Sequence, residues 1–293
     1  MRTSFVAMVA FMTLASFAAR AEADPLRVLF FSKSAGFEHD VVKVKDGQPC
    51  HVETVIAPLI EGMGGTLVST KDGAILTAEK LKDFDVVIFY TTEDLCKTDA
   101  ADGSPPAGPD AMPALLEWVE AGGGLVGFHC ASDTWHRERN QFAPESPYLD
   151  VIGGEFRGHG AQFVGTLRVV DPEHPTMARL KDGWKINDEW YLFSHLQKET
   201  MRVLALLDPA EEREKQEMYR VPDYPVIWCS ASGKGRVFYN AMGHRDDVWT
   251  NPDFKAHFED TIRWAGGEGE TRAEPNWSEV VPPELDPLTG AAR

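Results

Sequence analysis

Short apolar runs alternate with segments whose apolar residues recur at helical spacing through the first half of the chain. The runs with strand character are residues 26–31, 66–69, 85–90 and 125–128, and the helical patterns are residues 52–63 and 111–121. Thr77 is placed to cap a further short helix. Strands and helices in this order form βαβ units around a parallel sheet. We therefore predict an α/β fold of three layers, flavodoxin-like, with a mostly parallel central sheet and helices on both faces.

The second half of the chain is richer in strand-like segments. These are residues 162–170, 190–193, 201–207, 225–229 and 236–242, and an amphipathic pattern over 253–264 predicts a closing helix. After Gly266-Gly267 the sequence turns polar and rich in proline. We therefore expect one α/β domain over residues 22–267, followed by an extended, loosely held C-terminal tail over residues 268–293.

The first residues have the three-part pattern of a cleaved secretory signal. Arg2 precedes an apolar run over residues 5–19, and small residues surround positions 19–21. The run is shorter than the roughly 20 apolar residues that span a bilayer. We therefore expect residues 1–21 to be a signal peptide, the mature protein to be periplasmic or secreted, and no membrane association after cleavage.

The net charge of the chain limits the classes of molecule that can bind to it. The full chain carries a formal charge of −17, and loss of Arg2 and Arg20 with the signal would make it −19. Such a surface repels nucleic-acid phosphates and anionic lipids, so neither is an expected partner.

Four cysteines can pair in three ways in an oxidising compartment. Cys50 and Cys96 fall in polar loop sequence, whereas Cys130 and Cys229 follow strand-like runs and are expected to be buried thiols. We therefore predict a Cys50–Cys96 disulfide.

The segment GFHCASD, residues 127–133, follows a predicted strand and enters a predicted helix. A sharp turn of this kind presents one side chain above the sheet, beside a helix N-terminus. If Gly127 and Ala131 are the flanking small residues, the presented side chain is His129; an offset of one presents Cys130 instead. Asp133 opens the following helix, where its charge also suits the positive end of the helix dipole.

Several other polar side chains are expected at the carboxyl ends of the strands, where open α/β sheets bind their ligands. His39 follows the first strand and His244 follows the last one. His159 lies between two glycines, and Glu189 precedes two aromatic residues, in loops that can face the same crevice. Such groups either bind a divalent metal or transfer protons at a sugar carbon or glycosidic oxygen. The sequence leaves both uses open.

Aromatic rings offer flat apolar surfaces on which sugar rings stack. Phe37, Trp135, Trp190 and Trp249 are candidates to line a carbohydrate cleft, although aromatic residues serve more often in a core.

Several motifs together resemble one known family. They are SAGFEHD (34–40), GGGLVGFHCASD (122–133), GGEFRGH (153–159), HPT (174–176), DEWY (188–191) and GKGRVFYNAMGH (233–244). This set is similar to the trehalose-utilisation, or ThuA-like, family, whose fold resembles class I glutamine amidotransferases, and the resemblance covers about residues 26–267. In amidotransferases the elbow carries a nucleophilic cysteine, assisted by a late histidine. Here His129 aligns with the elbow position and Cys130 lies one residue on, so we do not expect glutaminase chemistry.

The resemblance implies a carbohydrate substrate. Our leading hypothesis is an exported sugar hydrolase, lyase or isomerase that acts on a disaccharide, glycoside or keto-sugar. The assigned catalytic residues are His129, Glu189, His244 and Asp133, and the assigned substrate-binding residues are His39, Trp135, Trp190 and Arg245. His129, His159 and His244 are the assigned ligands of a divalent metal such as zinc. Two alternatives stay open: a non-catalytic periplasmic sugar-binding or scaffold domain, and a thiol enzyme that uses Cys130.

Overall fold

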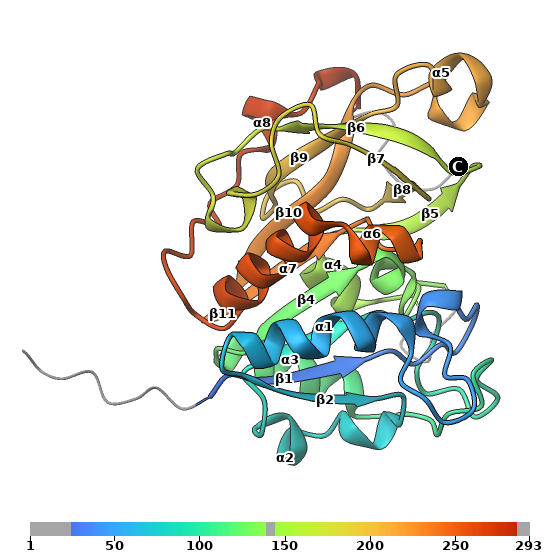
Figure 1. Cartoon of the computed structure of the whole chain (residues 1–293), viewed down its shortest axis with the longest axis vertical. Coiled ribbons are helices and arrows are strands. Elements are labelled where there is room, and N and C mark those ends of the chain that lie inside the picture. The colour runs from blue at the N-terminus through green and yellow to red at the C-terminus, as the bar shows by residue number, and fades with distance from the viewer. Residues whose placement is uncertain (1–24, 139–143, 286–293) are drawn as a thin grey trace, which may run out of the picture.

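The computed structural model describes residues 25–138 and 144–285, which build a central nine-stranded sheet (Figure 1). Its strand order is β2-β1-β3-β4-β11-β10-β9-β6-β7. The strands are β1 (Arg27–Phe31), β2 (Thr66–Thr70), β3 (Val86–Phe89), β4 (Gly124–Phe128), β6 (Phe163–Val169), β7 (Lys185–Asp188), β9 (Arg202–Asp208), β10 (Tyr224–Ser232) and β11 (Gly235–Asn240). The signal peptide proposed for residues 1–21 lies outside the described residues.

Most strands of the sheet point in one direction. Neighbours from β2 through β1, β3 and β4 to β11 pair in parallel. From β11 onward each strand pairs antiparallel with the next, so β9 and β7 again point the same way as β11, whereas β10 and β6 run opposite. The α/β fold with a mostly parallel sheet is therefore confirmed.

Helices cover both faces of the sheet. The helices are α1 (His51–Gly62), α2 (Ala78–Leu81), α3 (Ala111–Ala121), α4 (Pro147–Ile152), α5 (Glu212–Lys215), α6 (Asp246–Thr250), α7 (Pro252–Ala265) and α8 (Trp277–Val280). In Figure 1, α1 and α7 lie in front of the sheet, while α3 and α4 lie behind it. Both layers are needed because every residue of β3 is fully buried, so neither face of that strand can meet water.

A small second sheet was not predicted. It pairs β5 (Glu155–His159) with β8 (Tyr191–Ser194) in antiparallel fashion. It contacts the short 3-10 helix η3 (His129–Asp133). The other 3-10 helices among the described residues are η1 (Asp40–Val42), η2 (Gly73–Ile75), η4 (Pro175–Met177), η5 (Glu217–Tyr219) and η6 (Pro283–Leu285). The ribbon of β5 and β8 brings His159 and Tyr191 to the elbow at the end of β4.

The segment that we expected to be a loose tail packs against the sheet as far as Leu285. The buried Asn276 accepts a hydrogen bond from the Val203 amide at 2.7 Å and donates one to the Val203 carbonyl at 3.0 Å, so it extends the edge of β9. Trp277 and Leu285 are buried as well. The expectation overlooked these apolar side chains because proline and charged residues surround them.

The predicted Cys50–Cys96 disulfide is wrong, since all four cysteines are free thiols. Cys50 is buried directly before α1, at the N-cap position. Cys96 lies in the loop after β3, where its thiol donates to the Gly108 carbonyl at 3.4 Å. The prediction paired the two cysteines because both fall in polar loop sequence. In the folded chain they have different neighbours.

No helix in the described parts of the chain is long and apolar enough to cross a membrane.

Candidate active site

His129 stands at a strained turn where β4 ends. Its φ angle is +44°, in the left-handed region that residues with a side chain rarely adopt. The turn is tight: a Cβ at Gly127 would lie 2.9 Å from that of Ala131, so only glycine fits there. The imidazole is fully buried, and its Nδ1 lies 2.9 Å from the Ala241 carbonyl oxygen. A carbonyl can only accept, so Nδ1 carries the proton, and in the neutral ring Nε2 keeps its lone pair.

His244 comes from the loop after β11, and Asp188 fixes that loop. Gly243 adopts a φ of +121°, which lets the chain turn sharply before His244. The buried Asp188 accepts hydrogen bonds from the Gly243 amide at 2.7 Å and from the Glu189 amide at 2.9 Å. One carboxylate therefore sets the positions of both His244 and Glu189.

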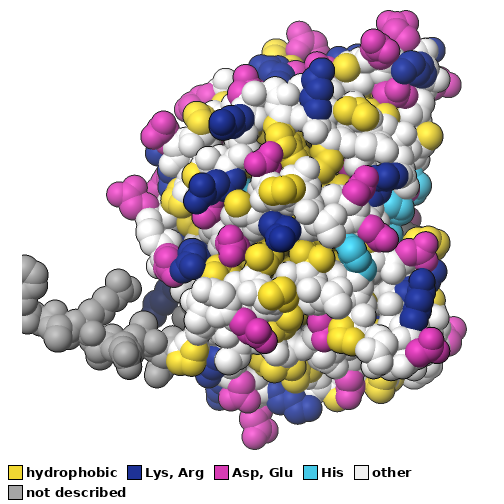
Figure 2. Space-filling view, in the orientation of Figure 1, with side chains coloured by type: hydrophobic (Ala, Val, Ile, Leu, Met, Phe, Trp, Pro, Cys, Tyr) yellow, Lys and Arg dark blue, Asp and Glu magenta, His cyan; other side chains and the backbone are white. Residues whose placement is uncertain are grey.

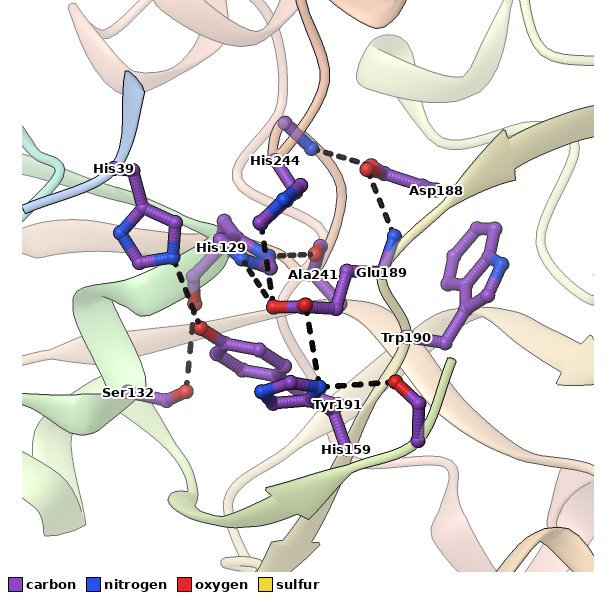
Figure 3. Close-up of polar contacts among 12 residues, drawn as sticks. His39, His129, Ser132, His159, Asp188, Glu189, Trp190, Tyr191, Ala241 and His244 are labelled. Atoms are coloured by element: carbon purple, nitrogen blue, oxygen red, sulfur yellow. Dashed lines mark hydrogen bonds and ion pairs between the residues drawn. The ribbon is translucent and has the colours of Figure 1, made fainter. Parts of the chain in front are cut away.

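The Glu189 carboxylate lies among three imidazoles (Figure 3). Its Oε2 is 3.5 Å from His129 Nε2 and 3.2 Å from His244 Nδ1, and its Oε1 is 3.2 Å from His159 Nδ1. His39 completes the group, with its ring centroid 4.9 Å from that of His129 and 5.3 Å from that of His244. The four side chains of His39, His129, Glu189 and His244 each offer a ligand atom, and these atoms all lie within 4.8 Å of one another. We call this set the His3Glu cluster.

The electrostatics of the cluster favour an anionic carboxylate among imidazoles. Burial opposes ionisation of Glu189, but the interactions with His129 and His244 outweigh it and hold the pKa of Glu189 well below its usual range. Burial, reinforced by the neighbouring His129 and His244, places the pKa of His39 well below 6.5, so this ring is neutral at pH 7. Burial acts in the same direction on His244, but the interaction with Glu189 prevails and raises the pKa of His244.

Burial also raises the pKa of Asp188 to about 6, although nearby histidines oppose the shift.

Tyr191 covers the cluster from one side. Its ring centroid lies 4.1 Å from that of His129, and its hydroxyl is 3.5 Å from His39 Nε2. Sequence reasoning did not assign a role to Asp188 or Tyr191, although both belong to the DEWY motif that drew attention to Glu189.

The His3Glu cluster fits a divalent cation. His129 Nε2 and His244 Nδ1 are buried, lie beside the same carboxylate oxygen, and make no well-formed hydrogen bond. Buried polar atoms are seldom left in this way. The bond from His129 Nδ1 to a backbone carbonyl is the orientation that supports a metal-ligating histidine. Imidazole with carboxylate is a donor set that suits zinc and related transition metals.

One of the three predicted ligands lies outside the His3Glu cluster, and two other residues belong to it. His159 does not belong to the cluster, because its Nδ1 lies 3.0 Å from the Gly160 carbonyl oxygen and its side chain is 40% exposed. His39, which we expected to bind substrate, takes its place, and Glu189 joins as the carboxylate. Histidine side chains reach the surface on the right-hand side of Figure 2, the side toward which β1 points in Figure 1. The site lies at the carboxyl ends of the strands, because His129 directly follows β4 and His244 lies in the loop after β11.

Several other predicted site residues lie elsewhere. Asp133 ends the η3 turn and pairs with His136 outside the cluster. Trp135 and Trp190 are fully buried, and Trp190 donates from its indole to the Phe163 carbonyl, so neither ring can stack on a sugar. Trp249 is buried as well. Arg245 is partly exposed and lines a pocket beside His244.

Cys130 is buried in the core behind His129. Burial, followed by the charge of Asp133, raises the pKa of its thiol well above the ordinary value. A thiol is nucleophilic as its thiolate, so this environment does not support cysteine catalysis.

Comparison with known proteins identifies the family. The model of the trehalose-utilisation family, ThuA, matches residues 27–265, from the start of β1 to the end of α7. This chain belongs to the ThuA family. The family resemblance inferred from the sequence motifs is thus confirmed.

Solved structures share the ThuA fold at low sequence identity. A ThuA-like protein from Bacteroides uniformis is 21% identical, with a TM-score of 0.63 and coverage of 85% of this chain and 95% of that one. A ThuA-like protein from Parabacteroides merdae is 16% identical, with a TM-score of 0.59 and coverage of 86% and 94%. A cytoplasmic protein from Salmonella typhimurium is 12% identical, with a TM-score of 0.54 and coverage of 82% and 99%. At these identities the likeness concerns the fold alone. Among curated proteins, none matches this chain.

Proposed function

We propose that this ThuA-family protein is a carbohydrate-processing enzyme, a hydrolase, lyase or isomerase, whose His3Glu cluster binds a divalent metal such as zinc. The observation that carries the proposal is the pair of buried imidazole nitrogens, His129 Nε2 and His244 Nδ1, beside one ionised carboxylate. The family's link with trehalose utilisation supports a glycoside, disaccharide or keto-sugar as the substrate.

His39, His129, Glu189 and His244 would hold the metal. A divalent cation bound there would act as a Lewis acid and polarise a sugar oxygen. Asp188 keeps two of the four ligands in place through its bonds to the Glu189 and Gly243 amides. The Tyr191 ring packs against the ring of His129 and limits access of water to it, and the His129 ring is fully buried.

His159 is the candidate for proton transfer. Its Nδ1 donates to the Gly160 carbonyl and lies 3.2 Å from Glu189 Oε1, which leaves Nε2 with a lone pair. The ring is accessible and stands outside the His3Glu cluster, so it can exchange protons with a substrate while the metal stays bound. Such a general acid–base contributes typically 100-fold to 10,000-fold to a rate.

The proposal includes export, which rests on the signal-like pattern of residues 1–21. Expression in a bacterial host with a periplasm, followed by N-terminal mass determination, should find the mature chain outside the cytoplasm without these residues. A cytoplasmic chain that retains residues 1–21 would contradict export.

The enzymatic function is tested with a panel of glycosides, disaccharides and keto-glycosides. Turnover should disappear after chelation and return with a divalent metal. His159→Gln should lower kcat about 100-fold or more with unchanged metal content, whereas the control His195→Gln should leave both unchanged, because His195 pairs with Glu155 outside the cluster. Turnover that survives complete metal removal would contradict the proposal, and sugar binding without turnover would favour a non-catalytic binding domain.

A further inference from the structure

A pocket of about 390 Å³ opens beside the His3Glu cluster. His244 lines it and also belongs to the cluster, so the pocket adjoins the residues that would hold a metal. Phe37, Gln162, Arg245 and Asp247 form other parts of the lining. The volume lies within the range of small-molecule sites.

Phe37 is an exposed aromatic residue at the rim of this pocket. Its relative exposure is 67%, and it is the aromatic member of the few large hydrophobic residues exposed in the described chain. Its ring meets that of His39 edge-on, with centroids 4.9 Å apart, so the ring is fixed next to the cluster. An aromatic face left open to water at a pocket gains free energy when a ligand covers it.

The polar side chains that line the pocket already bond to one another or to neighbouring residues. This arrangement disfavours the binding of anions. Arg245 donates from Nε and Nη2 to the two oxygens of Asp247, both at 2.9 Å, and from Nη1 to Gln162 Oε1 at 2.8 Å. The guanidinium charge is thus balanced, and the Gln162 amide group keeps its N–H donors. Asp40 and Asp246 are also in the lining, and Asp40 pairs with Lys43 at 2.6 Å. A phosphate group would have to displace these carboxylates.

We propose that this pocket binds an uncharged sugar ring, which stacks on Phe37, accepts hydrogen bonds from Gln162 and Arg245 and donates to Asp247, and that it rejects phosphorylated sugars. The inference rests on the proposed function, because it supplies the subsite that holds the sugar against the His3Glu cluster. It assigns substrate selection to residues that do not hold the metal. Phe37 supplies the apolar surface, and the polar wall, in which Asp247 balances the charge of Arg245, supplies the preference for hydroxyl groups.

The test measures binding by calorimetry and turnover separately, with the metal-loaded protein, a neutral keto-glycoside and its 6-phosphate ester. Phe37→Ala should weaken binding of the neutral sugar and raise KM about tenfold, with unchanged metal content. Phe37→Tyr, which keeps the ring, should stay close to wild type, and so should the control Val68→Ala, an exposed apolar residue on β2. The phosphate ester should bind at least tenfold more weakly than the neutral sugar.

The outcomes separate the two proposals. Turnover by wild type with no effect of Phe37→Ala, or equal binding of the phosphate ester, would overturn the pocket assignment and leave the enzymatic function standing. Sugar binding that depends on Phe37 without any turnover would support the pocket and contradict the enzymatic function. No binding of any neutral sugar by the metal-loaded protein would overturn both.

Discussion

At the scale of single residues, the burial of each ring decides what each histidine can do. His129 and His244 could be predicted from the sequence, because each directly follows an apolar strand. Whether a histidine ligates or transfers protons could not be predicted, since that depends on how far the folded chain buries the ring. His129 and His159 both use Nδ1 for this bond, but the ring of His129 is buried and that of His159 is accessible. The sequence alone placed His159 with the ligands and His39 with the substrate.

Cys130 offers a direct check on the role of the elbow. Because its thiol is buried and the pKa of that thiol is raised, Cys130→Ala should keep kcat/KM within about threefold of wild type and lower stability by about 1 kcal/mol. Sugar turnover and thermal unfolding of the same preparation measure both effects. A loss of turnover of more than 100-fold in a folded variant would restore the thiol hypothesis.

At the scale of elements, the predicted strands were those with continuous or alternating apolar residues. β5 and β7 escaped prediction because their sequences, EFRGH and KIND, are polar and lack the alternation of a half-buried strand. These two strands position His159, Asp188 and Glu189. The sequence therefore could not predict the part of the site that these two short polar strands position.

Asp188, at the end of β7, is expected to position the metal ligands and not to bind the metal itself. Asp188→Asn cannot accept equally well at both oxygen positions, so it should release either the Glu189 or the Gly243 amide. Metal affinity should fall about 10-fold to 100-fold, measured by competition with a chelator. The matched control is Asp182→Asn, which also alters an aspartate that accepts from a backbone amide, that of Val169, outside the site. Equal affinities for the two variants would contradict this role.

His257 on α7 should make the stability of the folded chain decrease at acidic pH. Burial lowers the pKa of His257 to about 4, against 6.5 for an exposed imidazole. Between these values the unfolded chain binds a proton at His257 and the folded chain does not, so stability falls as pH decreases from 6.5 toward 4, by roughly 3 kcal/mol in total. Denaturant unfolding across this range measures the effect. His257→Gln, which cannot ionise, should show a shallower decline, and an unchanged pH dependence would contradict the assignment.

At the scale of the whole molecule, the sheet gathers residues from distant parts of the chain at one edge. The buried apolar runs of the first half predicted a mostly parallel sheet, and such sheets bind ligands at the carboxyl ends of their strands, so the fold and the location of the candidate site were predictable, whereas the strand order was not. The docking of residues 271–285 and the separation of Cys50 from Cys96 depend on contacts between remote segments, which local sequence patterns do not encode. Contacts between remote segments also bury Trp135 and Trp190 in the core, as the bond from the Trp190 indole to the Phe163 carbonyl illustrates.

The measurement that tests the central claim most directly is calorimetric titration of the chelator-treated protein with zinc. We predict one zinc ion per chain, an affinity reduced at least 100-fold in His129→Ala and in Glu189→Gln, and unchanged binding in the control His195→Gln. These residues are chosen because the first two belong to the His3Glu cluster and the third does not. Absence of zinc binding, or binding that is undiminished in His129→Ala, would contradict the account.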